Sequence, residues 1–96
     1  MTGFRGRYKN KRDANEPEIF DALRKSGLCV EATDKPTDAV VGYGGRTYLV
    51  EVKNGPKARL TEAQAEFMGS WTGHAAVLAS VDEALAFAKR VKEDDE

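Results

Sequence analysis

The 96-residue sequence has one cysteine, one histidine, three prolines and no long apolar run. Cys29 cannot form an internal disulfide, and Cys29 and His74 together do not offer the ligand spacing of a zinc site. No apolar stretch approaches the ~20 residues that span a bilayer. These shortages argue against a disulfide-stapled domain, a zinc fold and a membrane protein. We expect Cys29 in the core and His74 in a structural role at a strand edge.

The N-terminal stretch MTGFRGRYKNKR is basic, but it lacks an apolar segment and a small-residue cleavage site. It therefore does not have the pattern of a secretory signal, and we expect a cytoplasmic protein. The length fits one domain with a single core. We divide the chain into a basic arm over residues 1–12, one domain over residues 13–92 and an acidic tail over residues 93–96.

The formal net charge is -1, but the charges are segregated along the chain. Residues 1–12 contain basic residues and no acid, and an excess of base recurs over residues 35–59. Such clusters favour a polyanionic partner, because the neutralisation of phosphates releases counterions. For residues 1–12 the alternative is a solvated terminal arm with no partner, and the charge pattern does not decide between the two.

Apolar spacing and capping signals predict the element order α-β-β-β-α-β-α. The predicted helices cover residues 15–26, 61–71 and the segment after Ser80, the predicted strands cover 28–32 and 74–79, and a hairpin covers 37–55. The expected fold is α/β, with a mixed central sheet flanked by helices and a C-terminal helix. The helix sides expected to face the core comprise Ile19, Phe20 and Leu23, then Leu60, Phe67, Met68 and Trp71, and finally Val81, Leu85 and Ala88.

The hairpin is indicated by Gly44-Gly45, because glycine accepts the positive φ angles of the primed turns. If these two glycines form the loop, counting outward along the strands places Asp38 directly opposite Glu51. A four-residue loop centred on the same glycines keeps this register, whereas a three-residue loop would destroy it. The face without the acids is expected to be apolar core and consists of Ala39, Val41, Val50 and Val52.

Directly opposed carboxylates destabilise a strand pair, so something must offset their repulsion. A raised pKa, an adjacent cation or a bound metal ion would each do so. Lys53 lies two residues beyond Glu51 and shares its face. Two carboxylates beside a lysine favour a divalent cation site suited to phosphodiester hydrolysis. The alternative is a surface Asp38 beside an ordinary Glu51–Lys53 ion pair.

Two further polar residues can reach this site from helices. Glu16 lies on the apolar stripe of the first helix, although the helix dipole also explains an acid in the first turn. Glu18 is displaced from that stripe, but uncertainty about the helix start keeps it as an alternative helix acid. Gln64 either continues the sheet-facing side of its helix or is the capping-box partner of Thr61.

Glu16, Asp38, the run Glu51-Val52-Lys53 and Gln64, in this element order, resemble the motifs of the PD-(D/E)XK nuclease superfamily. The chain is most similar to the small VRR-NUC-type nucleases of phages and prophages, and more distantly to the archaeal Holliday junction resolvases. The resemblance covers nearly the whole chain, through RDANEPEIFDALRKSG, PTDAVVGYGGRTYLVEVKNG, LTEAQAEF and SVDEALAF. In one departure, the chain has Pro36-Thr37-Asp38 where the family usually has Pro-Asp.

The resemblance implies a restriction-endonuclease-like αβββαβ core and a Mg²⁺- or Mn²⁺-dependent DNA endonuclease. The implied metal ligands are Asp38, Glu51 and the backbone carbonyl of Val52. The implied catalytic set is Lys53, Glu16, Asp38, Glu51 and Gln64, in which Lys53 is the catalytic lysine. If a phage encodes the chain, the expected location is the host cytoplasm.

The expected DNA contacts, mainly to phosphates, are Arg5, Arg7, Lys9, Lys11, Arg12, Arg46, Lys57 and Arg59. A small domain has little surface for reading bases, so we expect recognition of shape, and the resemblance implies a four-way junction or other branched DNA. Cutting both strands needs two sites, which a two-fold homodimer supplies most easily. The alternatives are a non-catalytic nucleic-acid-binding module on the same fold and a purely structural or interaction protein.

Overall fold

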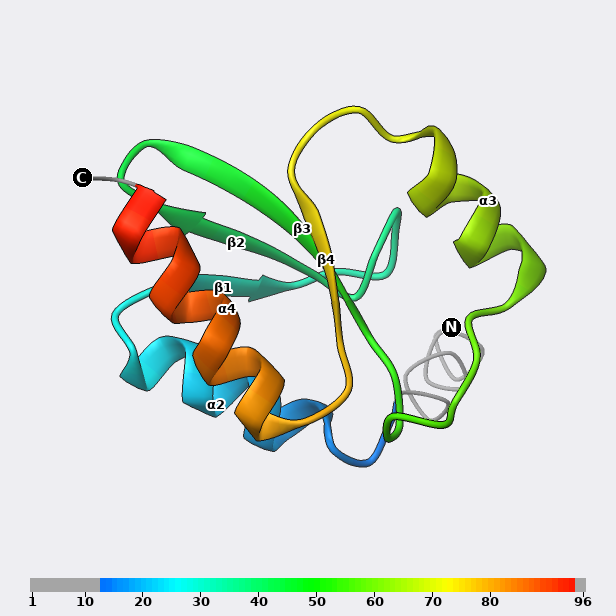
Figure 1. Ribbon diagram of the computed structural model, residues 1–96, viewed down its shortest axis with the longest axis horizontal. Helices are drawn as coiled ribbons and strands as arrows, with labels where there is room; N and C mark the ends of the chain where they lie inside the picture. The colour runs from blue at the N-terminus through cyan, green and yellow to red at the C-terminus, as the bar shows by residue number, and fades with distance from the viewer. Residues whose placement is uncertain (1–12, 95–96) are drawn as a thin grey trace, which may run out of the picture.

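The computed structural model describes residues 13–94 and has the expected α-β-β-β-α-β-α order (Figure 1). The elements are α2 (Glu16–Lys25), β1 (Cys29–Ala32), β2 (Ala39–Tyr43), β3 (Arg46–Val52), α3 (Glu62–Ser70), β4 (Ala75–Leu78) and α4 (Val81–Asp94). The predicted α/β class and C-terminal helix are thus confirmed. The helix α4 includes Glu93 and Asp94, which the sequence division had placed in the acidic tail.

The four strands form one mixed sheet in the order β1-β2-β3-β4. The first three strands are antiparallel neighbours, and β4 lies parallel to β3. Gly44 and Gly45 have φ angles of 59° and 83°, so glycine is needed at both positions of the tight turn. Ala39 pairs with Val50, which confirms the predicted register. The next step outward sets Asp38 opposite Glu51.

The core lies between one face of the sheet and the helices α2 and α4, which run side by side (Figure 1). The apolar face predicted for the hairpin is buried, with Ala39, Val41 and Val50 at 0% exposure. Ile19 and Leu23 bring the apolar stripe of α2 onto this face. Among the described residues, no helix has the length and apolar character needed to cross a membrane.

The burial predicted for Leu85 and for Cys29 is wrong. Leu85 is 47% exposed, because the side of α4 that packs on the core is formed by Ala84, Phe87, Ala88 and Val91 and leaves Leu85 on the flank. Cys29 is also exposed. It lies in a short edge strand, β1, of which only Val30 is buried.

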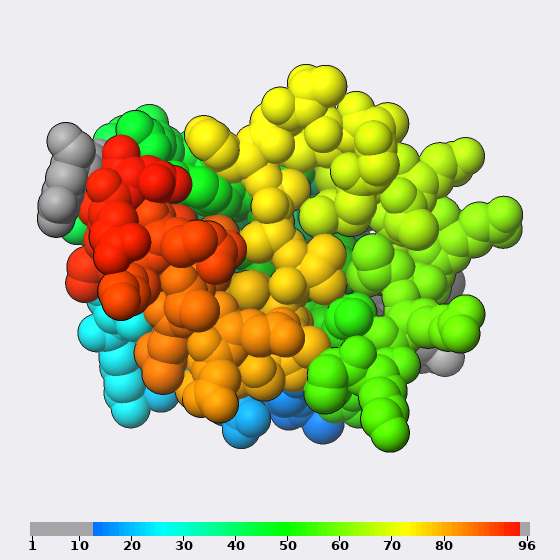
Figure 2. Space-filling model, in the orientation of Figure 1, coloured from blue at the N-terminus to red at the C-terminus, as the bar shows by residue number. Residues whose placement is uncertain are grey.

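The helix α3 stands apart from the other two helices and forms its own part of the surface (Figures 1 and 2). None of its residues is buried, although the sequence predicts that its apolar side packs against the sheet. Phe67 and Met68 are half-buried, and Trp71 at its end is 43% exposed. The prediction fails because, among the described elements, α3 lies away from α2 and α4, so its apolar side is only partly covered.

The burial pattern predicts unequal costs for two similar truncations. Ile19→Ala should lower the free energy of unfolding by roughly 2–5 kcal/mol, because it leaves a cavity at a fully buried position. Leu85→Ala should change it by no more than about 0.5 kcal/mol, because Leu85 lies at the surface. Urea denaturation of both variants measures the difference. Equal losses would contradict the arrangement of α2 and α4 on the core.

Candidate active site

Asp38 is held at the end of the β2–β3 ladder by backbone contacts. Its Oδ2 atom accepts a hydrogen bond of 2.8 Å from the Val52 N–H, and its carbonyl accepts one of 2.8 Å from the Thr33 N–H. The preceding Thr37 is buried, and its hydroxyl donates to the Ala39 carbonyl at 3.0 Å. The additional threonine in Pro36-Thr37-Asp38 therefore has a buried, hydrogen-bonded place and does not displace the acid.

Glu51 lies near the end of β3 and is 4% exposed. Burial is the largest cause that raises the pKa of its carboxyl group to about 8. A side-chain hydrogen bond with Asp38 and the charges of Asp38, Asp13 and Glu16 raise the pKa further. At neutral pH, without a bound cation, the Glu51 carboxyl therefore retains a proton.

Gln64 fills both of the roles that the sequence left open. Its Oε1 accepts from the Thr61 N–H at 2.8 Å, while the Thr61 hydroxyl accepts from the Gln64 N–H at 3.1 Å, which completes the capping box. Its Nε2 donates to Glu51 Oε2 at 2.7 Å. The capping box thus orients the amide so that its donor faces the buried acid.

Of the two candidate helix acids, Glu16 is the one at the site. Glu16 is 6% exposed and its charge contributes to the raised pKa of Glu51, whereas Glu18 is exposed. Asp13, which sequence reasoning missed, also lies here, and burial followed by the charge of Asp38 raises its pKa. The one sequence signal that could have indicated Asp13 is its position just before the helix. In the structure its carbonyl accepts a hydrogen bond of 3.1 Å from the Glu16 N–H.

Asn15 connects the elements around the acids. Its Nδ2 donates to the carbonyls of Lys53 at 2.9 Å and Ala79 at 3.0 Å, which ties the start of α2 to the ends of β3 and β4. Asn15 is the N-cap residue of α2, but its side chain makes no capping hydrogen bond. Among the described residues, its Oδ1 is buried without a hydrogen-bond partner. Sequence reasoning missed this connection because an asparagine before a helix usually caps it.

Three helices begin around this end of the sheet. The helix α2 starts at Glu16, α3 contributes Gln64 from its first turn, and α4 starts shortly after Ala79. Helix N-termini carry partial positive charge. The fold thereby supplies a modest electrostatic offset to the acids, and no basic side chain of residues 13–94 forms an ion pair with Glu51.

Lys53 directly follows β3, and its backbone N–H donates to the Leu78 carbonyl at 2.9 Å. Lys53 and Glu51, both among the described residues, form no ion pair with each other, so the surface ion-pair alternative does not describe them. Lys57 and Arg59 are exposed between β3 and α3. Arg46 starts β3 at the hairpin turn, five residues and roughly 16 Å from Glu51 along the strand, so the fold does not bring it to the acids.

The last residues with expected roles are the basic DNA contacts of the N-terminal segment and the structural His74. Arg5, Arg7, Lys9, Lys11 and Arg12 lie outside the described residues. His74 is exposed just before β4, where its carbonyl accepts from the Leu49 N–H at 3.1 Å and its ring lies 4.7 Å from that of Tyr48. This position corresponds to the structural role at a strand edge expected for His74.

The donors at the site suit a hard divalent cation. In residues 13–94 there is no group of three or more His, Cys, Asp and Glu side chains that could hold a metal ion. The pair of Asp38 and Glu51, with the Val52 carbonyl as the further expected ligand, matches Mg²⁺, which binds through one or two carboxylates and keeps several waters. The fit therefore rests on two carboxylates, of which Glu51 is buried, and not on a closed protein cage.

No protein-family model, curated protein or solved structure matches the chain. The relation to PD-(D/E)XK nucleases stays an expectation from the sequence motifs.

The raised pKa of Glu51 predicts a pH dependence of stability in metal-free buffer. Between its ordinary pKa of 4.5 and about 8, the folded state binds a proton at Glu51 that the unfolded state has lost. The free energy of unfolding should therefore fall as pH rises through this window. Urea denaturation across the window should show a shallower slope for Glu51→Gln, which cannot titrate. Identical slopes would contradict the buried, protonated carboxyl.

The Asn15 connection predicts a stability loss of its own. Asn15→Ala removes the donor to two strand-end carbonyls and should lower the free energy of unfolding by roughly 1–3 kcal/mol. Asn54→Ala is the matched control, because Asn54 is exposed beside Lys53 and should be neutral. Chemical denaturation compares the two, and equal stability of both variants would argue against the connection.

Proposed function

We propose that the protein is a metal-dependent nuclease that hydrolyses phosphodiester bonds of DNA at the Asp38–Glu51 site. The observation that supports this most is the burial of Glu51 opposite Asp38, with Asp13 and Glu16 close enough to raise its pKa. Buried like charges destabilise a fold unless a proton or a cation offsets them. A divalent cation would satisfy the pair and bring it into contact with a phosphate.

In this proposal Asp38, Glu51 and the carbonyl of Val52 hold Mg²⁺ or Mn²⁺. A bound cation of this kind supplies polarisation of the scissile phosphate and a lower pKa for a bound water. Gln64 holds the Glu51 carboxyl in place through its 2.7 Å hydrogen bond. Glu16 and Asp13 keep the surroundings negative, which favours a cation over a free anion at this point.

Lys53 is the proposed catalytic lysine. It follows Glu51 by two residues, and the strand period directs both side chains to the same face. Its ammonium group would stabilise the negative charge that develops on the phosphate, or orient the attacking water. Asn15 binds the carbonyl of Lys53 and so fixes the backbone that carries this group.

The proposed substrate is branched DNA, with a four-way junction as the first choice from the resemblance. Lys57 and Arg59 are exposed on the segment between β3 and α3, and they would contact phosphates beside the site. A two-fold homodimer would present two such sites to the two strands of a junction.

Lys53→Ala should lower the rate of Mg²⁺-dependent cleavage of a four-way junction by roughly 100-fold or more, because it removes a donor to developing charge. Binding of the same junction in a gel shift without metal should be retained. Lys89→Ala, at an exposed lysine of α4, is the matched control and should cleave normally.

Each possible failure of this experiment has a distinct meaning. Absence of metal-dependent cleavage by the parent protein, with binding intact, would replace the nuclease by a non-catalytic binding module. Equal cleavage by Lys53→Ala and the parent would remove Lys53 from the mechanism. Equal activity on linear duplex would contradict selectivity for branched DNA.

A further inference from the structure

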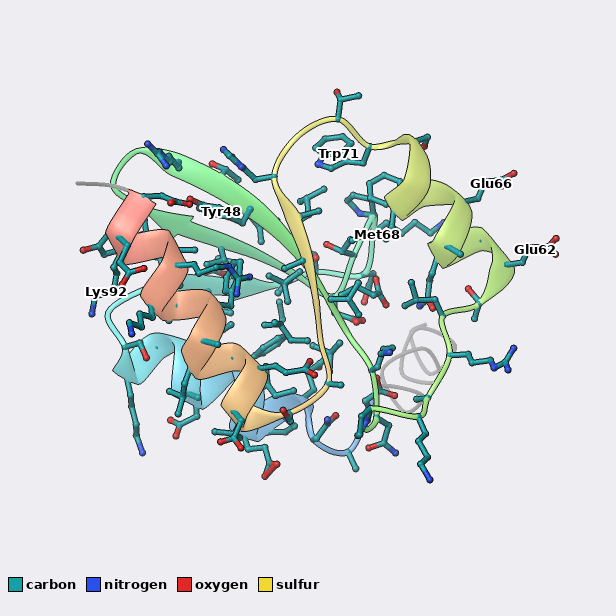
Figure 3. All side chains as sticks on the ribbon, viewed as in Figure 1. Tyr48, Glu62, Glu66, Met68, Trp71 and Lys92 are labelled. Carbon is teal, nitrogen blue, oxygen red and sulfur yellow. The ribbon has the colours of Figure 1, made fainter. Side chains whose placement is uncertain are left out.

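Trp71 is the only tryptophan of the chain and lies at the end of α3. It is 43% exposed, and Leu85 is the other large apolar residue exposed among residues 13–94. In Figure 3 the Trp71 indole lies at the outer margin of the molecule, between α3 and the loop to β4. This exposed aromatic group has no role in the acid site.

The indole ring is held in one orientation. Its Nε1 donates to the His74 carbonyl at 3.2 Å, and its ring lies against that of Phe67 with centroids 5.4 Å apart at 25°. Gly73 packs so closely that a Cβ there would lie 2.9–3.0 Å from three atoms of the indole. An aromatic group that is already fixed loses little conformational freedom when it binds a ligand.

The geometry of α3 relates Trp71 to the acid site. Gln64, in the first turn of α3, is bonded to Glu51, and Trp71 follows seven residues later on the same side of the helix. At 1.5 Å per residue the separation along the helix is roughly 10 Å. Stacked nucleotides are spaced by about 3.4 Å, so this distance corresponds to roughly three nucleotides of one strand.

The acidic side chains of α3 do not lie on the side of the helix that carries Gln64 and Trp71, so they do not repel a DNA strand there. Glu62 and Glu66 are directed away from the sheet, whereas Met68 lies on the opposite side of the helix, toward it (Figure 3). Lys57 and Arg59 are exposed just before the helix begins, where they provide positive charge for phosphates.

We propose that Trp71 is a stacking site for an unpaired nucleobase of the substrate strand, a few nucleotides from the bond that is cut. The proposal rests on the proposed function and adds a preference for single-stranded segments, because paired bases in a duplex do not expose their faces. A second protein chain is the less favoured occupant. A stable dimer needs about 800 Å² from each partner, far more than one exposed ring beside half-buried neighbours provides.

The single tryptophan gives a direct readout. The full chain is titrated, in EDTA, with a forked DNA that carries an unpaired arm, and separately with a fully paired duplex of equal length. The fork should quench the Trp71 fluorescence, and the duplex should do so only weakly. Because no metal is present, the result does not depend on cleavage, so failure of the nuclease proposal and failure of this one remain distinguishable.

Variants are compared by the fluorescence anisotropy of labelled fork. Trp71→Ala should bind the fork roughly 5- to 100-fold more weakly, the range expected for one base–aromatic stack. Trp71→Phe should lose less, and Gly73→Ala should also weaken binding because its Cβ displaces the indole. Leu85→Ala is the matched control for an exposed apolar side chain and should bind as the parent does.

Three results would overturn the proposal. The first is no quenching by the fork together with unchanged affinity of Trp71→Ala. The second is equal quenching by fork and duplex, which would remove the requirement for an unpaired base. The third is unchanged fork affinity of Trp71→Ala with a shift toward monomer in sedimentation, which would assign the ring to contact between two copies of the chain.

Discussion

Two carboxyl groups face each other where β2 and β3 leave their ladder, and most of the surrounding structure holds them there. The turn at Gly44 and Gly45 fixes the register that opposes Asp38 to Glu51. Because Glu51 is buried, ionising its carboxyl group opposite Asp38 costs free energy, and its pKa is raised as a result. A proton offsets the repulsion in metal-free protein, whereas a cation would offset it in the proposed enzyme. Metal binding at this site would therefore be coupled to proton release.

The elements around the two carboxyl groups mainly fix where these groups lie. The backbone N–H of Val52 and the amide of Gln64 each donate to one of the two carboxyl groups. Asn15 joins the start of α2 to the ends of β3 and β4, so the backbone of Lys53 is fixed relative to the acids. The helix α3 brings Gln64 to the site at one end and carries the exposed Trp71 at the other. The proposed stacking site thus lies on the helix that orients a proposed metal ligand.

The parts that could be predicted from the sequence depend on local rules. Two glycines define the turn, and strand alternation then separates the core face from the acid face. Side-chain contacts over long separations could not be predicted in this way. Asn15 bonds to residues 38 and 64 positions away. Exposure also depends on which neighbours are present: Leu85 and Trp71 belong to apolar patterns, but no element within residues 13–94 covers them fully.

The most direct test of the account is the binding of Mn²⁺, measured by calorimetry below pH 8 with the parent chain and with Asp38→Asn/Glu51→Gln. The substitutions keep the shapes of the side chains and remove their charges. The account predicts that the parent binds Mn²⁺ with release of protons, because Glu51 must lose its proton to become a ligand. It predicts that the double variant does not bind. Absence of binding to the parent, or equal binding to both proteins, would contradict a cation site at the carboxyl pair.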